Sequence, residues 1–433
     1  MSTGWRNWSR SVRCAPHRIA RPRDEAEVVD ELALARSHSR TVRAVGSGHS
    51  FNALASTDGT LLDMSDCAGV ERIDRDASTV TAWAGTSLAA LNAALHREDM
   101  ALPNVGTITG QTVAGALATG NHGTGLAHGP FASLVVALRL ATADGRILDC
   151  DEHNDPELFR CARTSLGALG VVTKVTLRCV PAFRLRSEPG SRSLDDLLDG
   201  FDGWVGSADH VSANWLPWRD TVSTTKLHRT DASPTKGARL RPLVTTVDEV
   251  RCGIAGLSAR FGPGMVRRVS ETLPPHRPSV SYVDSSFRVF SFPQPVKFFA
   301  LEHALPLAGV PDAVRALRGP LRRFGLFSPY SLLIRVGAAD DAPLSPAYGR
   351  ATGYVNLTVP RTARYVELLR TVEHVLREHD ARPHWGKAHT ATAEILRPRY
   401  PEWDTFARMR GKLDPDGRFT NDHIARLLGS PDE

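Results

Sequence analysis

The first half of the chain alternates short apolar runs, rich in β-branched residues, with stretches of helical period. An apolar stripe predicts a helix that begins near Glu25, with Asp24 as its N-cap. A second predicted helix, over 88–95, has Ser87 as its cap. Strands are predicted at 41–45, 61–64, 79–84, 134–141 and 170–180, and one more helix at 156–163.

The pattern changes near Pro181, where longer alternating strands separated by Pro-containing turns begin. Such alternation is typical of an antiparallel sheet, so residues 184–375 are predicted to form a second domain. Its clearest strands are predicted at 211–216, 296–305, 331–336 and 353–359. The chain is then predicted to end with a helix over 363–379, a turn at 413–421 and a short last helix. The predicted boundaries are 1–183, 184–375 and 376–433.

Residues 45–52 read Val-Gly-Ser-Gly-His-Ser-Phe-Asn and follow a predicted strand. Gly46 and Gly48 allow a tight turn whose backbone N–H groups converge, and such a nest binds phosphate. An imidazole, His49, in its centre favours a cofactor that is held by its pyrophosphate and contacted by, or bonded to, that histidine. The dinucleotide fingerprint G-x-G-x-x-G is excluded, because Phe51 replaces its third glycine and no helical pattern follows. Taken alone, the octet fits a glycine turn with an exposed histidine equally well.

A second informative stretch, 104–129, contains seven glycines. Glycine at this density costs conformational entropy, which is most easily explained where backbone closely approaches a bulky ligand. The alternative is a flexible loop, but the apolar run 113–118 is unlike one. We therefore predict that this stretch lines a ligand.

Composition narrows the class of protein. With 433 residues and 42% hydrophobic content, the chain can bury the cores of two domains, and no apolar run is long enough to span a membrane. The first ten residues lack the apolar region of a signal peptide. Six scattered cysteines without a C-x-x-C pair predict reduced thiols in a cytoplasm, with no zinc site. The net charge of +6 is spread along the chain, which does not indicate nucleic-acid binding.

Late in the chain, His384-Trp385-Gly386-Lys387 follows Pro383. A buried lysine beside an aromatic ring and a histidine is suited to stabilise an anion. A metal site is not expected, because His384 and His389 are five residues apart with no carboxylate between them. A polar surface loop is the alternative interpretation.

Together these segments resemble the vanillyl-alcohol-oxidase-type flavoproteins with a PCMH-type FAD domain, and within them the sugar-lactone and alditol oxidases. The resemblance covers nearly the whole chain and is carried by six motifs in order: 46–50, 121–125, 165–170, 345–350, 384–387 and 414–417. It implies an α+β fold with a two-part FAD-binding domain (1–183), an inserted antiparallel-sheet cap domain for the substrate (184–375) and a C-terminal segment (376–433) that returns to the flavin site.

The resemblance also implies that His49 is covalently bonded to the flavin 8α-methyl group, which raises the flavin's reduction potential and prevents its loss. The residues that it implies for FAD binding lie in the octet, in the glycine-rich stretch and at two later positions. They are Gly46, Ser47, Gly48, His49, Ser50, Asn52, Thr107, Gly110, Ala114, Gly115, Thr119, Asn121, His122, Gly123, Val172 and Asn421.

For catalysis the resemblance implies that Lys387 stabilises the anionic reduced flavin and that Arg335 holds the substrate oxygen; His384 is a candidate base by its position in the sequence alone. The implied substrate residues are Thr107, Glu302, Leu333, Arg335, Thr358 and Lys387. The relatives carry Glu-x-Arg where this chain has Leu333-Ile334-Arg335, so its pocket is less polar and Arg335 has one partner fewer. Glu302 is a possible substitute, unless it faces solvent.

The implied reaction is FAD-dependent oxidation of a CH–OH group of a sugar-derived lactone or polyol, with hydride transfer to flavin N5 and reoxidation by O2 to give H2O2. The alternative is a dehydrogenase that uses another electron acceptor. The small residues Ala114 and Gly115 are expected to decide whether O2 is accepted. Leu333 supports a second reading, a tailoring oxidase for a less polar or modified sugar or another secondary metabolite. A catalytically weak flavin-binding protein is the third. The sequence leaves the substrate, the acceptor, the base and the oligomeric state open.

Overall fold

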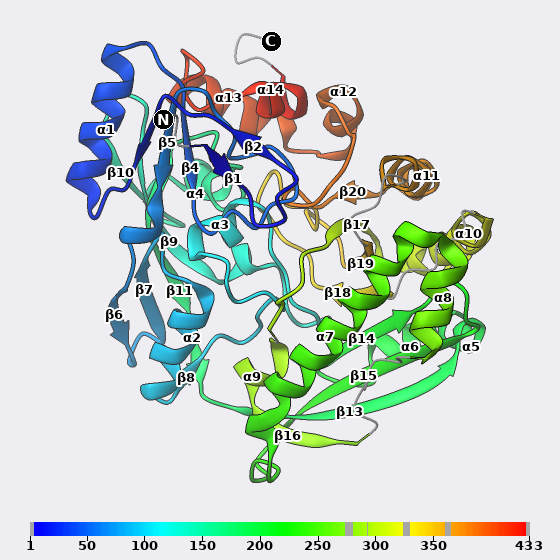
Figure 1. Cartoon of the computed structure of the whole chain (residues 1–433). Helices are drawn as coiled ribbons and strands as arrows, with labels where there is room; N and C mark the ends of the chain where they lie inside the picture. Colours follow the sequence, from blue (N-terminus) through cyan, green and yellow to red (C-terminus); the bar gives the residue numbers. More distant parts are fainter. Residues whose placement is uncertain (1–3, 273–279, 292, 324–329, 360–364, 430–433) are drawn as a thin grey trace.

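The computed structural model describes residues 4–272, 280–291, 293–323, 330–359 and 365–429. Figure 1 shows an N-terminal region of small sheets and helices beside a second region built on one large sheet, with the C-terminal helices returning to the first. The mixture of helices with mostly antiparallel sheets confirms the predicted α+β class.

The N-terminal region contains two sheets. A parallel sheet joins β3 (Arg18–Ala20), β5 (Thr60–Asp63) and β4 (Val42–Val45). The other is antiparallel, in the order β10 (Ile147–Asp151), β9 (Val135–Ala141), β11 (Val171–Arg178), β7 (Thr79–Trp83) and β6 (Val70–Asp74). Two short pairs complete the region: β1 (Trp5–Arg6) with β2 (Arg13–Cys14), and β8 (Met100–Ala101) with β12 (Val180–Pro181).

The large sheet has eight strands. Their order is β16 (Tyr282–Ser285), β13 (Arg184–Ser193), β15 (Thr221–Thr230), β14 (His210–Trp215), β18 (Leu332–Gly337), β19 (Thr352–Val359), β17 (Phe299–Pro306) and β20 (Arg382–Pro383). All of their pairings are antiparallel, as the alternating pattern predicted. The last strand comes from beyond residue 375, so the C-terminal segment is part of this sheet.

The helices of the N-terminal region follow the predicted caps. Asp24 accepts from Glu27 N at α1 (Glu25–Ser37), and Ser87 accepts from Ala90 N at α2 (Leu88–Arg97). The others are α3 (Val113–Ala118) and α4 (Pro156–Ala162), with α12 (Ala393–Leu396), α13 (Trp403–Leu413) and α14 (Asp422–Leu428) added by the C-terminal segment.

The strand-based prediction for 184–375 missed most of the helices there. They are α5 (Leu194–Asp199), α6 (Phe201–Val205), α7 (Arg241–Leu257), α8 (Pro263–Thr272), α9 (Ser286–Phe290) and α10 (Val310–Arg323). Gly253 and Gly256 interrupt the pattern of α7, and Pro320 lies inside α10, which weakened the helical signal. The predicted helix over 363–379 is α11 (Tyr365–Arg377), and residues 363–364 lie outside the described residues.

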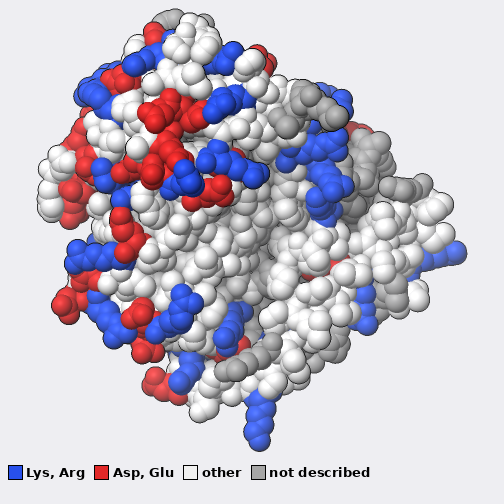
Figure 2. All heavy atoms as spheres, turned by 60° about the vertical axis from the view of Figure 1, so that its left-hand side comes forward, with Lys and Arg blue, Asp and Glu red and all other residues white. Residues whose placement is uncertain are grey.

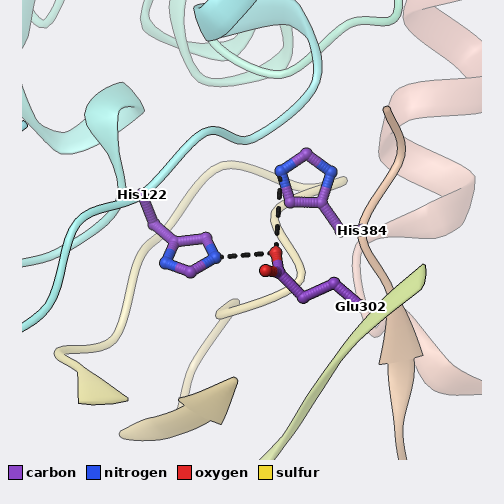
Figure 3. Close-up of side chains that lie close together, drawn as sticks. All are labelled: His122, Glu302 and His384. Carbon is purple, nitrogen blue, oxygen red and sulfur yellow. Dashed lines mark hydrogen bonds and ion pairs between the residues drawn. The ribbon is translucent and has the colours of Figure 1, made fainter. Parts of the chain in front are cut away.

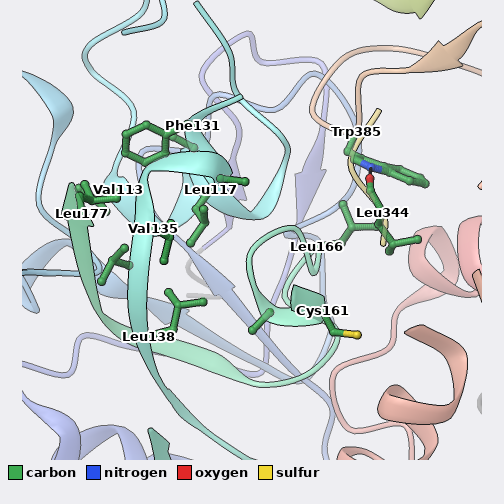
Figure 4. Packing of buried hydrophobic residues seen from close by; sticks show 14 of the residues in the cluster. Val113, Leu117, Phe131, Val135, Leu138, Cys161, Leu166, Leu177, Leu344 and Trp385 are labelled. Atoms are coloured by element: carbon green, nitrogen blue, oxygen red, sulfur yellow. Dashed lines mark hydrogen bonds between the residues drawn. The ribbon is translucent and has the colours of Figure 1, made fainter. Parts of the chain in front are cut away.

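The largest hydrophobic cluster joins the N-terminal region to the C-terminal segment. In Figure 4 the side chains of Val113 and Leu117 on α3 face those of Phe131 and Val135, while Trp385 lies at the other end against Leu344. The Trp385 indole donates to the Leu344 carbonyl over 2.6 Å, which satisfies a polar atom in a fully buried ring. This packing fixes the segment that carries residues 384–387.

On the face in Figure 2, lysine and arginine side chains are interspersed with aspartate and glutamate rather than gathered in one basic patch. In the described part of the chain, no helix combines the length and the apolar character that crossing a membrane requires.

Candidate active site

The octet forms a tightly held loop after β4. A Cβ on Gly46 would lie 2.0 Å from Thr112 Oγ1, and Gly48 has a φ of +65°, so both positions require glycine. Two backbone hydrogen bonds of 2.8 Å hold the loop, one from Trp8 N to Gly48 O and one from Phe51 N to Gly386 O. The loop is therefore fixed by the N-terminus on one side and by the C-terminal segment on the other.

A cavity opens at this loop, between β4, α3 and the 165–172 segment. Its lining includes Gly46, Ser47, Gly48, His49, Ser50, Asn52, Ala114, Gly115, Thr119 and Val172 from the predicted cofactor set. Gln111 and Thr112 also line it, in agreement with the prediction that residues 104–129 line a ligand. Trp5 and Arg43 line it as well and were not predicted.

The His49 ring is held in this cavity wall by stacking. Its ring centroid is 4.9 Å from that of Trp8 at an interplanar angle of 29°. Burial, with a contribution from the Lys387 charge, lowers the pKa of His49 to about 4, so the imidazole is neutral at pH 7. Its Nδ1 atom is buried without a hydrogen-bond partner among the described residues. A neutral ring with an unused nitrogen suits covalent bonding to a ligand.

The other predicted cofactor residues lie outside this lining. Asn121 donates to Gln111 Oε1 over 2.7 Å, and Thr107 contacts Arg335. Gly110 and Gly123 leave room for neighbouring side chains. A Cβ on Gly110 would lie close to His49 Nε2, and a Cβ on Gly123 would lie close to the Asn104 side chain. Asn421 caps α14 and donates to the carbonyls of residues 53, 54 and 56.

Glu302 faces the protein interior, so the alternative prediction, that it is a strand residue facing solvent, is wrong. It is 4% exposed, and its Oε1 lies 2.9 Å from His122 Nε2. Its Oε2 accepts from Asn356 Nδ2, also over 2.9 Å. Figure 3 shows His122 and His384 on either side of the carboxylate, coming from the glycine-rich stretch and from the segment after β20. The Tyr354 ring stacks on His122 at a centroid distance of 3.4 Å.

The hydrogen bonds of His122 fix how many protons this pair holds. Its Nδ1 faces the Gly123 carbonyl at 2.9 Å, and a carbonyl only accepts, so Nδ1 carries a hydrogen. The contact between His122 Nε2 and Glu302 then needs one shared proton. The pKa of Glu302 lies well below its usual value; although burial alone would raise it, the charges of His122 and Lys387 outweigh burial. With that one shared proton, the pair carries no net charge.

His384 does not have the geometry of a base. Its Nδ1 accepts from Gly386 N over 3.0 Å, so in the neutral ring the hydrogen is on Nε2, 3.9 Å from Glu302 Oε1. Burial lowers the pKa of His384 to about 3, which keeps the ring neutral. Because its one lone pair is already used, His384 is better suited to donate than to accept a proton.

The predicted substrate residues share one face of the large sheet. Leu333 on β18 pairs with Asn356 on β19, which pairs with Glu302 on β17, so the three side chains form a row. Arg335, two residues along β18, points to the same side and donates to Thr107 Oγ1.

Two further predicted residues border this row. Thr358, two residues along β19, donates to Asn356 Oδ1 over 3.1 Å. Lys387 lies where its charge acts on both Glu302 and His49, with its ammonium 5.5 Å from the centre of the Phe51 ring. The structure therefore brings the predicted substrate residues and the predicted flavin loop together.

The sequence pattern did not indicate metal ligands, yet His122, Glu302 and His384 place one ligand atom each within 4.8 Å of one another. Hydrogen bonds already use His122 Nε2, both Glu302 oxygens and His384 Nδ1. Two cations also interact electrostatically with Glu302. The Lys387 charge lowers the pKa of Glu302, and the Glu302 charge raises the pKa of Arg335. Nearby positive charge opposes a divalent cation, so we do not assign a metal here.

Comparisons with known proteins agree with this geometry. Residues 16–151 match the FAD binding domain, and residues 175–427 match D-arabinono-1,4-lactone oxidase. The chain is 36% identical over 430 residues to L-gulono-1,4-lactone dehydrogenase of Mycobacterium tuberculosis, covering 99% of this chain and 100% of that protein. It is 32% identical to the alditol oxidase of a Streptomyces species, covering 99% and 100%, and 30% identical to the L-gulonolactone oxidase of Bos taurus, covering 98% of each.

Among solved structures, cholesterol oxidase from Brevibacterium sterolicum superimposes with a TM-score of 0.80, covering 99% of this chain and 97% of that one at 19% identity. At this identity the likeness establishes the fold alone. The family match covers more than half of the chain, and the relatives cover nearly all of it. The protein therefore belongs to the D-arabinono-1,4-lactone oxidase family and is a FAD-dependent oxidoreductase.

Proposed function

We propose that this protein oxidises a CH–OH group of a sugar-derived lactone or polyol, with FAD bound in the cavity at the glycine loop and covalently attached through His49. The observation that carries the proposal is the position of Lys387: its ammonium lies over the ring of Phe51 in that loop, and its charge acts on Glu302 in the polar row. Bound FAD supplies the acceptor for a carbon-bound hydride and passes the electrons to dioxygen or to another acceptor.

Covalent attachment through His49 is supported by the state of its ring. The imidazole is neutral, held by Trp8, and has a buried Nδ1 without a partner among the described residues. The glycine loop places its backbone at the same cavity, where N–H groups bind the pyrophosphate.

The remaining groups act on the substrate and on developing charge. Arg335 and Thr107 hold the substrate oxygen, and Lys387 stabilises negative charge that develops on the cofactor side. The Glu302 charge raises the pKa of each cation against the effect of burial.

The electron acceptor is proposed to be dioxygen. Ala114 and Gly115 on α3, two of the smallest residue types, line the cavity. The relatives include both a dehydrogenase and oxidases, so the acceptor is tested directly. Peroxide formed in proportion to substrate supports an oxidase; reduction that persists in air supports a dehydrogenase.

A cytoplasmic location is proposed from the cysteines. All six are free thiols, and Cys67, Cys150, Cys161 and Cys179 are buried. Burial raises the pKa of these four thiols, to about 11 for Cys67 and about 12 for the other three, which keeps them protonated and unreactive.

The first test denatures the purified protein in acid and locates the yellow colour, with intact mass alongside. Colour in the pellet and a mass increase of one FAD support the covalent link, and His49→Ala should abolish both while some FAD stays bound. Colour in the supernatant rejects the link. Anaerobic mixing with lactones and polyols then tests the reaction: flavin bleaching supports it, and none with any member rejects it.

A second candidate function is favoured by Leu333, which puts an apolar, partly exposed side chain in the middle of the polar row. It is a tailoring oxidase for a less polar or modified sugar. Bleaching by deoxy or O-alkyl sugars, but by no simple lactone or polyol, would replace the first proposal with this one.

A further inference from the structure

Two cations in the site lack an anionic partner. Arg335 donates to the Thr107 hydroxyl, and no ion pair joins it to a carboxylate among the residues that the structure describes. The Lys387 ammonium makes no hydrogen bond in the same part of the chain and lies over the Phe51 ring. Burial lowers the pKa of both groups, so each position is unfavourable for a charge that has no partner.

In the described part of the chain, the only carboxylate whose charge acts on Arg335 or Lys387 already has its own hydrogen-bond partners. Glu302 shares one proton with His122 through Oε1 and accepts from Asn356 through Oε2. That pair has no net charge, and His384 beside it is neutral. The two cations are thus not neutralised, and the site as a whole is positive.

The sheet positions around Arg335 hold no carboxylate: Ser212 and Tyr354 pair with it directly, and Leu333 lies two residues away on β18. The side chains of Leu333 and Arg335 lie on the same side, about 7 Å apart along the strand. Leu333 pairs with Asn214 on one side and with Asn356 on the other, and both of these are uncharged. The neighbours of Leu333 on both sides therefore offer hydrogen bonds but no carboxylate to Arg335.

We propose that the substrate itself supplies the negative charge: it is a hydroxy acid of the sugar-acid type, whose carboxylate is bound by Arg335. This inference rests on the proposed CH–OH oxidation and narrows its substrate class. A guanidinium binds a carboxylate through two parallel hydrogen bonds, which a neutral lactone or polyol cannot reproduce. The carboxylate is unchanged in the reaction.

The balance of the reaction is that of alcohol oxidation. The carbinol C–H bond breaks, its hydrogen leaves with two electrons to FAD, and the hydroxyl proton leaves to solvent as the C=O bond forms. Lys387 remains free for the negative charge on the cofactor side, while Arg335 is occupied by the carboxylate. The two cations thus serve two different anions.

The test compares matched substrates with the holoenzyme. Anaerobic flavin reduction is followed with L-gulonate against L-gulono-1,4-lactone and with gluconate against glucono-lactone and sorbitol, at constant ionic strength. We expect kcat/KM to be at least about 10-fold higher for the acids. Leu333→Glu should reverse this preference by placing a carboxylate beside Arg335, whereas the uncharged control Leu333→Gln should keep it.

A second arm needs no turnover. Malonate and malonamide have the same skeleton and no CH–OH group, so they report binding by perturbing the oxidised flavin spectrum. Malonate should bind to the wild type and at least about 10-fold more weakly to Arg335→Met, and malonamide should bind to neither. Equal binding of malonate to both proteins would overturn the proposal, because the anion would then be held elsewhere.

The two parts of the test distinguish a failure of the anionic-substrate proposal from a failure of the proposed CH–OH oxidation. Bleaching by lactones in preference to acids, or equal effects of Leu333→Glu and Leu333→Gln, would overturn the anionic substrate while keeping CH–OH oxidation. If no acid, lactone or polyol bleaches the flavin, the proposed function fails, and the malonate arm alone decides whether Arg335 forms an anion site.

Discussion

The Trp8 indole lies against the His49 imidazole, with ring centroids 4.9 Å apart and planes inclined by 29°. The segment that carries Trp8 is pinned to the same loop by Asn7, whose Nδ2 donates to Ser50 O over 2.8 Å. Residues at the N-terminus therefore set the orientation of a ring 41 positions later in the chain. Since stacking leaves little freedom to the imidazole, it holds the ring in the orientation that the proposed covalent link would need.

Replacing Trp8 should reduce covalent flavin attachment without unfolding the protein. Trp8→Ala removes the stacking partner, so a smaller fraction of molecules should carry covalent FAD after expression. Trp8→Phe keeps a flat ring and should restore most of it. The measurement is the fraction of flavin in the acid pellet, with far-UV circular dichroism to establish folding. Full attachment in Trp8→Ala would show that the stack has no such role.

Glu302→Gln should change the pH dependence of flavin reduction. The Glu302 charge raises the pKa of Lys387, so its loss should lower that pKa and move the alkaline fall in rate to lower pH. The rate itself should drop at least about 10-fold, because the row loses its only carboxylate. The measurement is the rate of anaerobic reduction between pH 6 and 10.

Glu373→Gln is the matched control for that change. Glu373 is also a buried glutamate, 2% exposed, but it accepts from Thr390 rather than from the site residues. Its replacement should lower stability and leave the pH profile in place. A similar shift of the profile in both variants would mean that buried charge in general, and not Glu302, sets the Lys387 pKa.

Gly46→Ala should prevent flavin binding. The added Cβ would lie 2.0 Å from Thr112 Oγ1 and 2.9 Å from Thr112 Cβ, so the loop has to move away from α3. The expected result is protein with less than about a tenth of the normal flavin content and a stability lower by about 1–3 kcal/mol. Gly203→Ala, where a Cβ meets nothing within 4 Å, is the control and should keep its flavin. Normal flavin content in Gly46→Ala would contradict the geometry of this turn.

Stability should fall as the pH drops below the ordinary histidine pKa. Burial lowers the pKa of His303 to about 4 and that of His423 to about 3, from 6.5 in the unfolded chain. Between these values the unfolded state binds more protons, so each such histidine lowers the free energy of unfolding by about 1.4 kcal/mol per pH unit below 6.5. The holoenzyme's Tm should therefore decrease from pH 7.5 to 5, and His423→Phe should weaken that decrease. An equally steep decrease in the variant would exclude His423 from this effect.

Local signals in the sequence determined much of the N-terminal region and of the cofactor site. The caps Asp24 and Ser87 predicted two helices, because capping depends on neighbours a few residues away. The octet predicted a phosphate loop around His49 for the same reason, since the turn is made by its own glycines. Much of the predicted cofactor set lines the cavity.

Only the tertiary structure decided what Glu302, His122 and His384 do. They lie far apart in the chain and meet because β17, the glycine-rich stretch and the segment after β20 converge. The tautomer of His384 depends on Gly386 N, which made it a poor base although its sequence neighbours suggested one. The inward direction of Glu302 and the row that joins it to Leu333 follow from strand register. Register is set by long-range pairing, and no pattern within a single strand contains that information.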